Sequence, residues 1–119
     1  MIEEAAQGER VRVAPRGAYD PVPVLKALGH PLRYAMFELL AGGERCVCDL
    51  VDAVDASQPL VSHHLSVLKK AGLVSDRHDS TWVYYSVSPE SWEAFRRSME
   101  GIRPTGLPSA PCPPEDVPR

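Results

Sequence analysis

Two cysteines stand one residue apart, at Cys46 and Cys48, and this spacing gives them the chemistry of a chelate. Thiolates are polarizable and bind soft, thiol-seeking ions best, so the pair suits a trivalent metalloid or a soft metal. An isolated cysteine is more often a small buried hydrophobe, which is the alternative use for each of these residues. Two cysteines at this spacing instead predict a ligand site.

A third cysteine, Cys112, lies among prolines near the end of the sequence. Three cysteines in a reducing compartment argue against a disulfide scaffold and leave metal binding, redox chemistry or plain burial as their uses. An exposed cysteine with no packing role is best explained by its chemistry, so we expect Cys112 to supply a third sulfur to the pair. The alternative is an incidental cysteine in a disordered end.

The cysteine pair is expected to begin a short helix from about Cys46 to Val54, which buries Val47, Leu50, Val51 and Val54. Residues two apart on a regular helix diverge by about 200°, so both sulfurs cannot reach one ion while the helix stays intact. Ligand binding is therefore expected to bend or unwind this first turn.

Further helices and a hairpin are predicted on both sides of this one. Cap residues, prolines in first turns and closing glycines mark the helix ends, and a change of apolar period from 3.6 to 2 marks the strands. The expected elements are a helix after Asp20-Pro21 closed by Gly29, a helix from Pro31 to Gly42-Gly43, a helix from the Ser57 cap to Gly72, strands at 73–77 and 82–87, and a last helix after Ser88-Pro89 with Trp92, Phe95 and Met99 on one face.

This order predicts a mainly α fold with a β-hairpin, the winged helix-turn-helix ααααββα. At 119 residues and 44% hydrophobic composition, the chain supports one domain. We expect that domain at residues 20–102, after a flexible arm at 1–19 and before a Pro-rich tail at 103–119. Neither a membrane span nor a signal peptide is visible, so a cytoplasmic protein is expected.

The fourth helix would enter the major groove of DNA in such a fold. A net charge of −3 does not suit a general nucleic-acid binder, so binding must come from a local patch. Of the neighbours His63 and His64, which point about 100° apart, we expect one at DNA and the other partly buried. The alternative is an ordinary solvated helix face. The predicted DNA contacts are Gln58, Ser62, His63, Ser66, Lys69 and Lys70, with a modest contribution from Arg77 in the wing.

Four segments, LKALGHPLRYAMFELL, ERCVCDL, SQPLVSHHLSVLKKAGLV and DSTWVYYSVSP, resemble the ArsR/SmtB family of metalloregulators, and its arsenic-responsive branch in particular. The resemblance runs from Val24 to about Glu100 and covers about two-thirds of the chain. It implies a homodimer joined through the first and last helices. Such a dimer binds an imperfect palindrome in double-stranded operator DNA and represses a resistance operon until its inducer arrives.

The inducer implied by the resemblance is As(III) or Sb(III), and no cofactor is required. In the arsenic-responsive pattern a third cysteine follows three residues after the second, where this chain has Val51. Cys112 is therefore the expected third ligand, and a methylated trivalent arsenical is the expected inducer if Cys112 is not a ligand. Zinc or nickel sites of other branches use His and Asp on the last helix, and residues 92–99 contain neither.

Two other functions compete with this interpretation. A thiol redox or reactive-sulfur sensor on the same scaffold would form a bond from Cys46 or Cys48 to Cys112, and another thiol-seeking metal could replace arsenic. A small metal-dependent enzyme is disfavoured, because the histidines lie on different elements and no nucleophile is paired with a base and an orienting group. The chain is not expected to be an enzyme.

Overall fold

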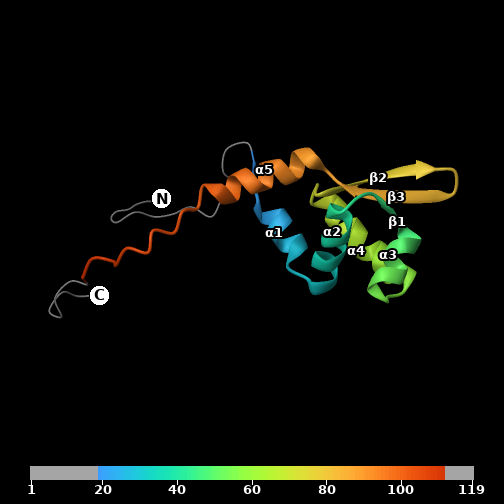
Figure 1. The fold of residues 1–119 in the computed structure, drawn as a ribbon, viewed down its shortest axis with the longest axis horizontal. Coiled ribbons are helices and arrows are strands. Elements are labelled where there is room, and N and C mark those ends of the chain that lie inside the picture. The colour runs from blue at the N-terminus through green and yellow to red at the C-terminus, as the bar shows by residue number, and fades with distance from the viewer. Residues whose placement is uncertain (1–18, 112–119) are drawn as a thin grey trace, which may run out of the picture.

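A computed structural model describes residues 19–111, and Figure 1 shows helices packed beside a small sheet that extends into a hairpin. The predicted order of helices and hairpin strands is confirmed, with one added strand. The elements are α1 (Val22–Leu28), α2 (Pro31–Ala41), β1 (Arg45–Cys46), α3 (Val47–Val54), α4 (Gln58–Lys70), β2 (Val74–Asp79), β3 (Trp82–Val87) and α5 (Pro89–Glu100).

The short strand β1 is the element that was not predicted. It pairs antiparallel with β3, with Arg45 opposite Tyr85 and Cys46 opposite Tyr84, so the sheet has the order β1-β3-β2. Two residues are too few to show a period of two in the sequence. As a result, Cys46 belongs to the sheet that forms the wing and is the N-cap of α3, so the third helix, expected from about Cys46, begins at Val47.

The helix caps largely follow the sequence signals. The Ser57 hydroxyl accepts the Leu60 backbone N–H at 3.3 Å, and Ser88 accepts that of Ser91 at 3.4 Å. At the start of α1 the Asp20 carboxylate accepts the Val22 N–H at 3.1 Å, although the cap residue itself is Pro21. Each of these bonds satisfies a backbone donor that would otherwise have no partner in the helix.

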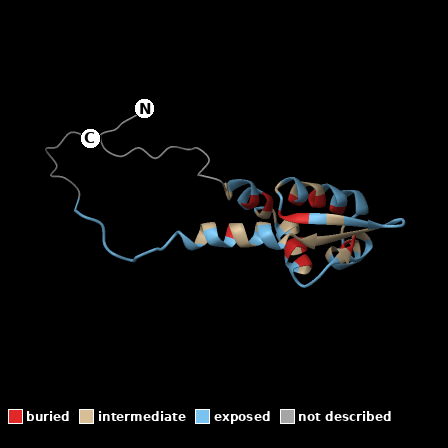
Figure 2. Cartoon of the chain, turned by 90° about the horizontal axis from the view of Figure 1, so that it is seen from above, coloured by how far each residue is buried: buried red, intermediate tan, exposed pale blue. Residues whose placement is uncertain are grey.

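The core is centred on α4, which contributes the fully buried side chains Val61, Leu65 and Leu68. Leu50 of α3 and Leu73, just before β2, are also fully buried in the same cluster. Figure 2 shows buried residues on the inward sides of the helices, whereas α5 is mostly exposed or half-buried along its length. The helix predicted to read DNA is therefore held on its inner side by the whole core.

The ends of the described region add two facts. Residues 103–111 contain no helix or strand and are exposed, while the remainder of the predicted tail, including Cys112, and residues 1–18 of the predicted arm lie outside the described residues. Across the part of the chain that is described, no helix combines the length and the apolar character needed to cross a membrane.

Candidate thiol site and nucleic-acid interface

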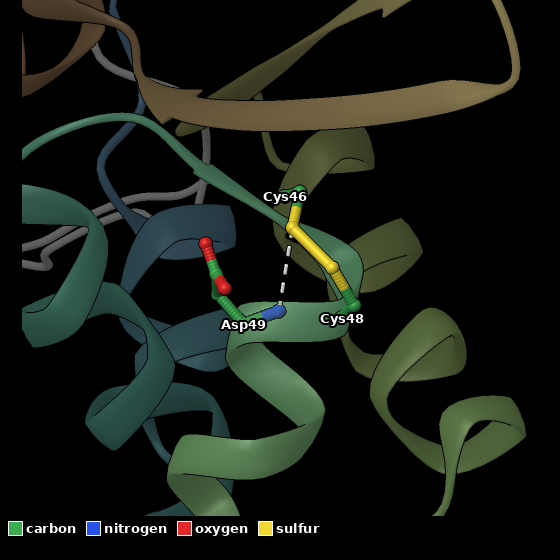
Figure 3. Close-up of side chains that lie close together, drawn as sticks. All are labelled: Cys46, Cys48 and Asp49. Atoms are coloured by element: carbon green, nitrogen blue, oxygen red, sulfur yellow. Dashed lines mark hydrogen bonds between the residues drawn. A yellow bond between two sulfur atoms is a disulfide. The ribbon is translucent and has the colours of Figure 1, made fainter.

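The two sulfurs of the Cys-x-Cys pair lie together, joined in a disulfide between Cys46 and Cys48 (Figure 3). Cys46 has an extended backbone, with φ −78° and ψ 162°, and is the N-cap of α3. Its Sγ accepts the backbone N–H of Asp49 at 3.4 Å. The expectation that the helix must unwind to bring the sulfurs together is therefore wrong, because one sulfur comes from the cap and not from the helix.

The pair joins a buried sulfur to an exposed one. Cys46, in the strand β1, is 8% exposed, whereas Cys48 on the first turn of α3 is exposed. The carboxylate of Asp49 completes a group whose ligand atoms all lie within 4.8 Å of one another. The sequence does not predict Asp49 as a ligand, because acidic residues are common in the first turn of helices of every function. The third predicted ligand, Cys112, lies outside the described residues.

Each cysteine is attached to a different part of the predicted DNA-binding unit. Cys46 pairs with Tyr84 in the strand β3 of the wing. Cys48 lies on α3, whose Leu50 packs in one core cluster with Leu65 of α4. The two sulfurs therefore lie where the wing meets the helix that supports α4.

The predicted DNA-contacting side chains lie on the outer face of α4 and on the wing, but some already have partners. The Ser66 hydroxyl donates to the His63 carbonyl at 2.9 Å, and Lys69 Nζ donates to Asp76 at 3.0 Å. These bonds orient the side chains, and a DNA phosphate would have to share Lys69 with Asp76. Exposed members are Gln58, Ser62, His63, Lys69, Lys70 and Arg77, and Ser66 is half-buried.

Arg77 of β2 forms a two-pronged ion pair with Glu44, which lies just before β1. Its Nε and Nη2 donate to the two carboxylate oxygens at 3.1 and 2.8 Å, and its guanidinium lies 4.6 Å from the centre of the Tyr84 ring. The hydrogen bond from Arg77 lowers the pKa of the Glu44 carboxyl. Glu44 was missed in the sequence because it is 33 residues from its partner. Its charge balances that of Arg77 and ties the wing to the cysteine strand.

Asp76 of β2 makes a second link, between the wing and the end of α4. It accepts hydrogen bonds from Lys69 and from His78, and the bond from Lys69 is the main cause of the lowered pKa of its carboxyl. This carboxylate therefore links the wing to the C-terminal turn of α4.

His64 is the buried member of the histidine pair, as expected, with 5% of its surface exposed. Its Nδ1 lies 3.1 Å from Arg33 Nη1, and its ring centroid lies 4.5 Å from that of His30. Burial is the main cause of its lowered pKa, followed by the charges of His30, Arg33 and His63. Arg33 also donates to the Ala27 carbonyl at 2.7 Å, so His64 connects α4 to α2 and α1.

Acidification is expected to destabilise the fold through His64. The folded-state pKa lies below the unfolded value near 6.5, so the unfolded chain binds the proton first as pH falls. The contribution of His64 is thus present above about pH 6.5 and lost as pH drops towards the folded pKa. Between pH 7.5 and pH 5.5, the free energy of unfolding measured with urea should fall less in His64→Asn than in the wild type. The amide oxygen of the asparagine can accept the hydrogen bond from Arg33. An equal loss in both proteins would contradict this role.

Comparisons with known proteins agree with this geometry. A family model described as bacterial regulatory protein, arsR family, matches residues 30–76. The arsenical resistance operon repressor of Escherichia coli is 43% identical over 92 residues, which cover 70% of this chain and 79% of that protein.

Two solved structures are similar in fold. The first is a crystal structure described as a possible transcriptional regulator for arsenical resistance, with 34% identity and a TM-score of 0.60 over 65% of this chain and 80% of that one. The second is a homodimeric winged helix-turn-helix DNA-binding domain from Mycobacterium bovis, described as a possible ArsR-family transcriptional regulator. It has 32% identity and a TM-score of 0.58 over 67% of this chain and 75% of that one.

Proposed function

The chain belongs to the ArsR family of winged helix-turn-helix transcriptional regulators, and from this premise we propose that it represses a metalloid-resistance operon and leaves its operator when trivalent arsenic binds Cys46 and Cys48. The observation that carries the proposal is the meeting of the two sulfurs at the junction of β1 and α3. Soft thiolates favour a soft, thiol-seeking ion over hard cations. Antimony(III) shares this chemistry and is proposed as a second inducer.

The solvent exposure of Cys48 and the attachment of Cys46 to the sheet both support a sensor role for the pair. Cys48 is exposed and can meet a ligand from solvent, whereas Cys46 is nearly buried against the sheet. Position at a helix N-terminus favours an anionic thiolate over a neutral thiol. We propose that a first bond forms at Cys48 and a second at Cys46, so that the strand carrying Cys46 is displaced in the second step.

Release then follows from a difference in ligand affinity between two arrangements of the protein. A ligand shifts an equilibrium only by as much as it prefers one state, and such couplings are typically about 1 to 3 kcal/mol. The two arrangements proposed here differ in how β1 pairs with Tyr84 and how α3 supports α4, with the Glu44–Arg77 pair moving along. Cys112 is proposed to complete the arsenic site as a third sulfur.

We propose that two copies of the chain bind DNA together. Apolar side chains of α1 and α5 are exposed, with Val22 47%, Leu25 46% and Trp92 37% exposed. A symmetric dimer would cover these side chains and present two α4 helices to two half-sites of an operator. Base contacts are proposed for Gln58, Ser62 and His63. We also propose that the protein acts in the cytoplasm.

The test is to measure affinity for DNA upstream of the protein's own gene in the reduced protein, by fluorescence anisotropy. We expect tight binding that trivalent arsenic reverses, with protection of two thiols, or of three if Cys112 is a ligand. Zinc at equal concentration serves as the control for a harder ion. Tight DNA binding that arsenite and antimonite leave unchanged would refute the proposed inducer.

The disulfide favours a second candidate, a redox-sensing repressor. The sequence suggested a bond from the pair to Cys112, whereas the structure joins Cys46 to Cys48 themselves. Loss of two electrons to a peroxide-class oxidant would then switch the same junction without a metalloid. Adding hydrogen peroxide in place of arsenite separates the two functions, because only a redox sensor would release DNA in that arm.

The two lysines at the end of α4 should contribute unequally to DNA binding. Lys69 is paired with Asp76, whereas Lys70 pairs with no carboxylate among residues 19–111. Each phosphate contact contributes about 0.9 to the slope of log affinity against log salt. Lys70→Gln is therefore expected to reduce the slope by about 1, and Lys69→Gln by less. Salt titrations of both variants check this order, and a larger effect of Lys69→Gln would contradict it.

A further inference from the structure

A cleft lies beside the exposed sulfur, between α3, α4 and the wing. Cys48 forms part of its wall, together with Gln58 and Ser62 from α4 and Trp82 and Tyr85 from β3. Its volume of about 420 Å³ lies within the range of small-molecule sites. Resting on the proposed function, we propose that this cleft holds the organic group of a trivalent arsenical that carries one small, neutral aryl substituent and is bound through Cys46 and Cys48.

The number of sulfurs matches an arsenical of this class. An aryl arsenical in its hydrated form, R–As(OH)₂, has two groups that thiols can replace, and its third bond is held by carbon. Two As–S bonds form, two As–OH bonds break, and the two thiol protons leave with the hydroxyls as two waters. No electrons are transferred. The reaction uses the dithiol form, which a phosphine or thiol reductant produces from the disulfide by supplying two electrons.

The walls of the cleft favour a flat apolar group. Trp82 is 53% exposed, an unusual position for a large aromatic side chain, and Val47 and Val83 add aliphatic surface beside Cys48. Aromatic rings attract one another in offset or edge-to-face arrangements beyond the effect of area alone. A bound aryl ring would cover the indole that water now contacts.

The charged groups of the cleft disfavour an anionic substituent. Asp76 lines the cleft, and its carboxylate is already bonded to Lys69 and His78. Its pKa is lowered, so it carries its negative charge at neutral pH. A carboxylate or sulfonate on the aryl ring would find no unpaired positive charge among the lining residues, because His78 already bonds to Asp76, which favours neutral rings.

The position of the cleft also supplies a direct effect on DNA binding. Gln58 and Ser62 lie in the N-terminal half of α4, where base contacts are proposed, and Trp82 begins the second strand of the wing. DNA that enters between α4 and the wing must pass the same wall that the aryl group would cover. The substituent would thus obstruct the DNA, in addition to any shift of β1 and α3.

The experiment compares arsenite with phenylarsine oxide on the reduced protein without DNA. Dissociation constants are measured by competition with a small dithiol chelator, in the wild type, in Trp82→Ala, and in Tyr34→Ala as a control. Tyr34 is 50% exposed on α2 and does not line the cleft. We expect Trp82→Ala to weaken the affinity for phenylarsine oxide by about 5- to 10-fold, the size of one aromatic contact. The affinity for arsenite should stay unchanged. Tyr34→Ala should change neither constant.

A second measurement uses Trp82 itself as the reporter. In a Trp92→Phe background, phenylarsine oxide should alter the remaining indole emission more strongly than arsenite does, because only the aryl ring would contact Trp82. The cleft assignment would be overturned if Trp82→Ala weakened the affinities for both arsenicals equally, or if the indole emission responded equally to both. Arsenite binding would still uphold the proposed function in that case. If neither arsenical protects Cys46 and Cys48 in the wild type, the proposed function fails as well.

Discussion

Replacement of Cys48 by serine is expected to abolish release by trivalent arsenic while operator affinity in its absence stays unchanged. In the wild type, saturating arsenite should weaken the DNA complex by about 100-fold, within the usual range of coupling between two sites. A serine hydroxyl is a hard ligand, and its presence leaves a single sulfur of the pair for a soft ion. Fluorescence anisotropy with labelled promoter DNA, with and without arsenite, measures both constants.

Two further variants make this result specific. Cys46→Ser should behave in the same way and remain folded, because serine is a good N-cap and can accept the Asp49 N–H that Cys46 Sγ now accepts. Cys112→Ser tests the third ligand: weaker arsenite binding with normal binding of phenylarsine oxide would support that role. A Cys48→Ser protein that still releases DNA on arsenite addition would contradict the thiol-pair mechanism.

Truncation of Leu65 to alanine is expected to lower the free energy of unfolding by about 3 to 5 kcal/mol. Leu65 is completely buried on the inner face of α4, in the cluster that contains Leu50 of α3 and Leu68 one turn further along. Its removal loses the transfer free energy of the missing atoms and leaves a cavity, since a packed core relaxes only in part. Urea unfolding followed by circular dichroism at pH 7.5 measures the loss.

Leu60→Ala on the same helix is the matched control. Leu60 has 44% of its surface exposed, so the same chemical change should shift the unfolding free energy by less than about 0.5 kcal/mol. A similar loss in both variants would show that helix propensity, and not burial, dominates the effect. The core argument for the placement of α4 would then be wrong.

Much of the fold could be read from local signals. Ser57 and Ser88 cap helices as their spacing predicts, and the change of period after Gly72 correctly marks the hairpin. These features depend on interactions between near neighbours, which the sequence shows directly. The two-residue strand β1 depends on pairing with β3 about 40 residues away, and no local pattern reveals it.

In the candidate site too, the residue types were predictable from the sequence and their geometry was not. The choice of Cys46 and Cys48 as its chemical groups needed only residue type and spacing. Their geometry depended on the pairing of Cys46 with Tyr84, which draws this residue out of the helix and into the sheet. The predicted unwinding of α3 was wrong for that reason. Helical periodicity describes a residue only if its backbone is helical, and here a tertiary contact made it extended.

The sequence by itself determined the order of the elements, the outer face of α4 and the thiol chemistry of the cysteine pair, because each depends on residue types and short-range periodicity. Only the tertiary structure decided what surrounds them. In the folded protein Arg77 pairs with Glu44 and Lys69 donates to Asp76. His64 is buried beside Arg33, and a cleft lies beside Cys48. Arg77 and Glu44 are 33 positions apart and His64 and Arg33 are 31 apart, while Lys69 and Asp76, 7 apart, lie on different elements. All three contacts form because α4 and the wing pack around one core.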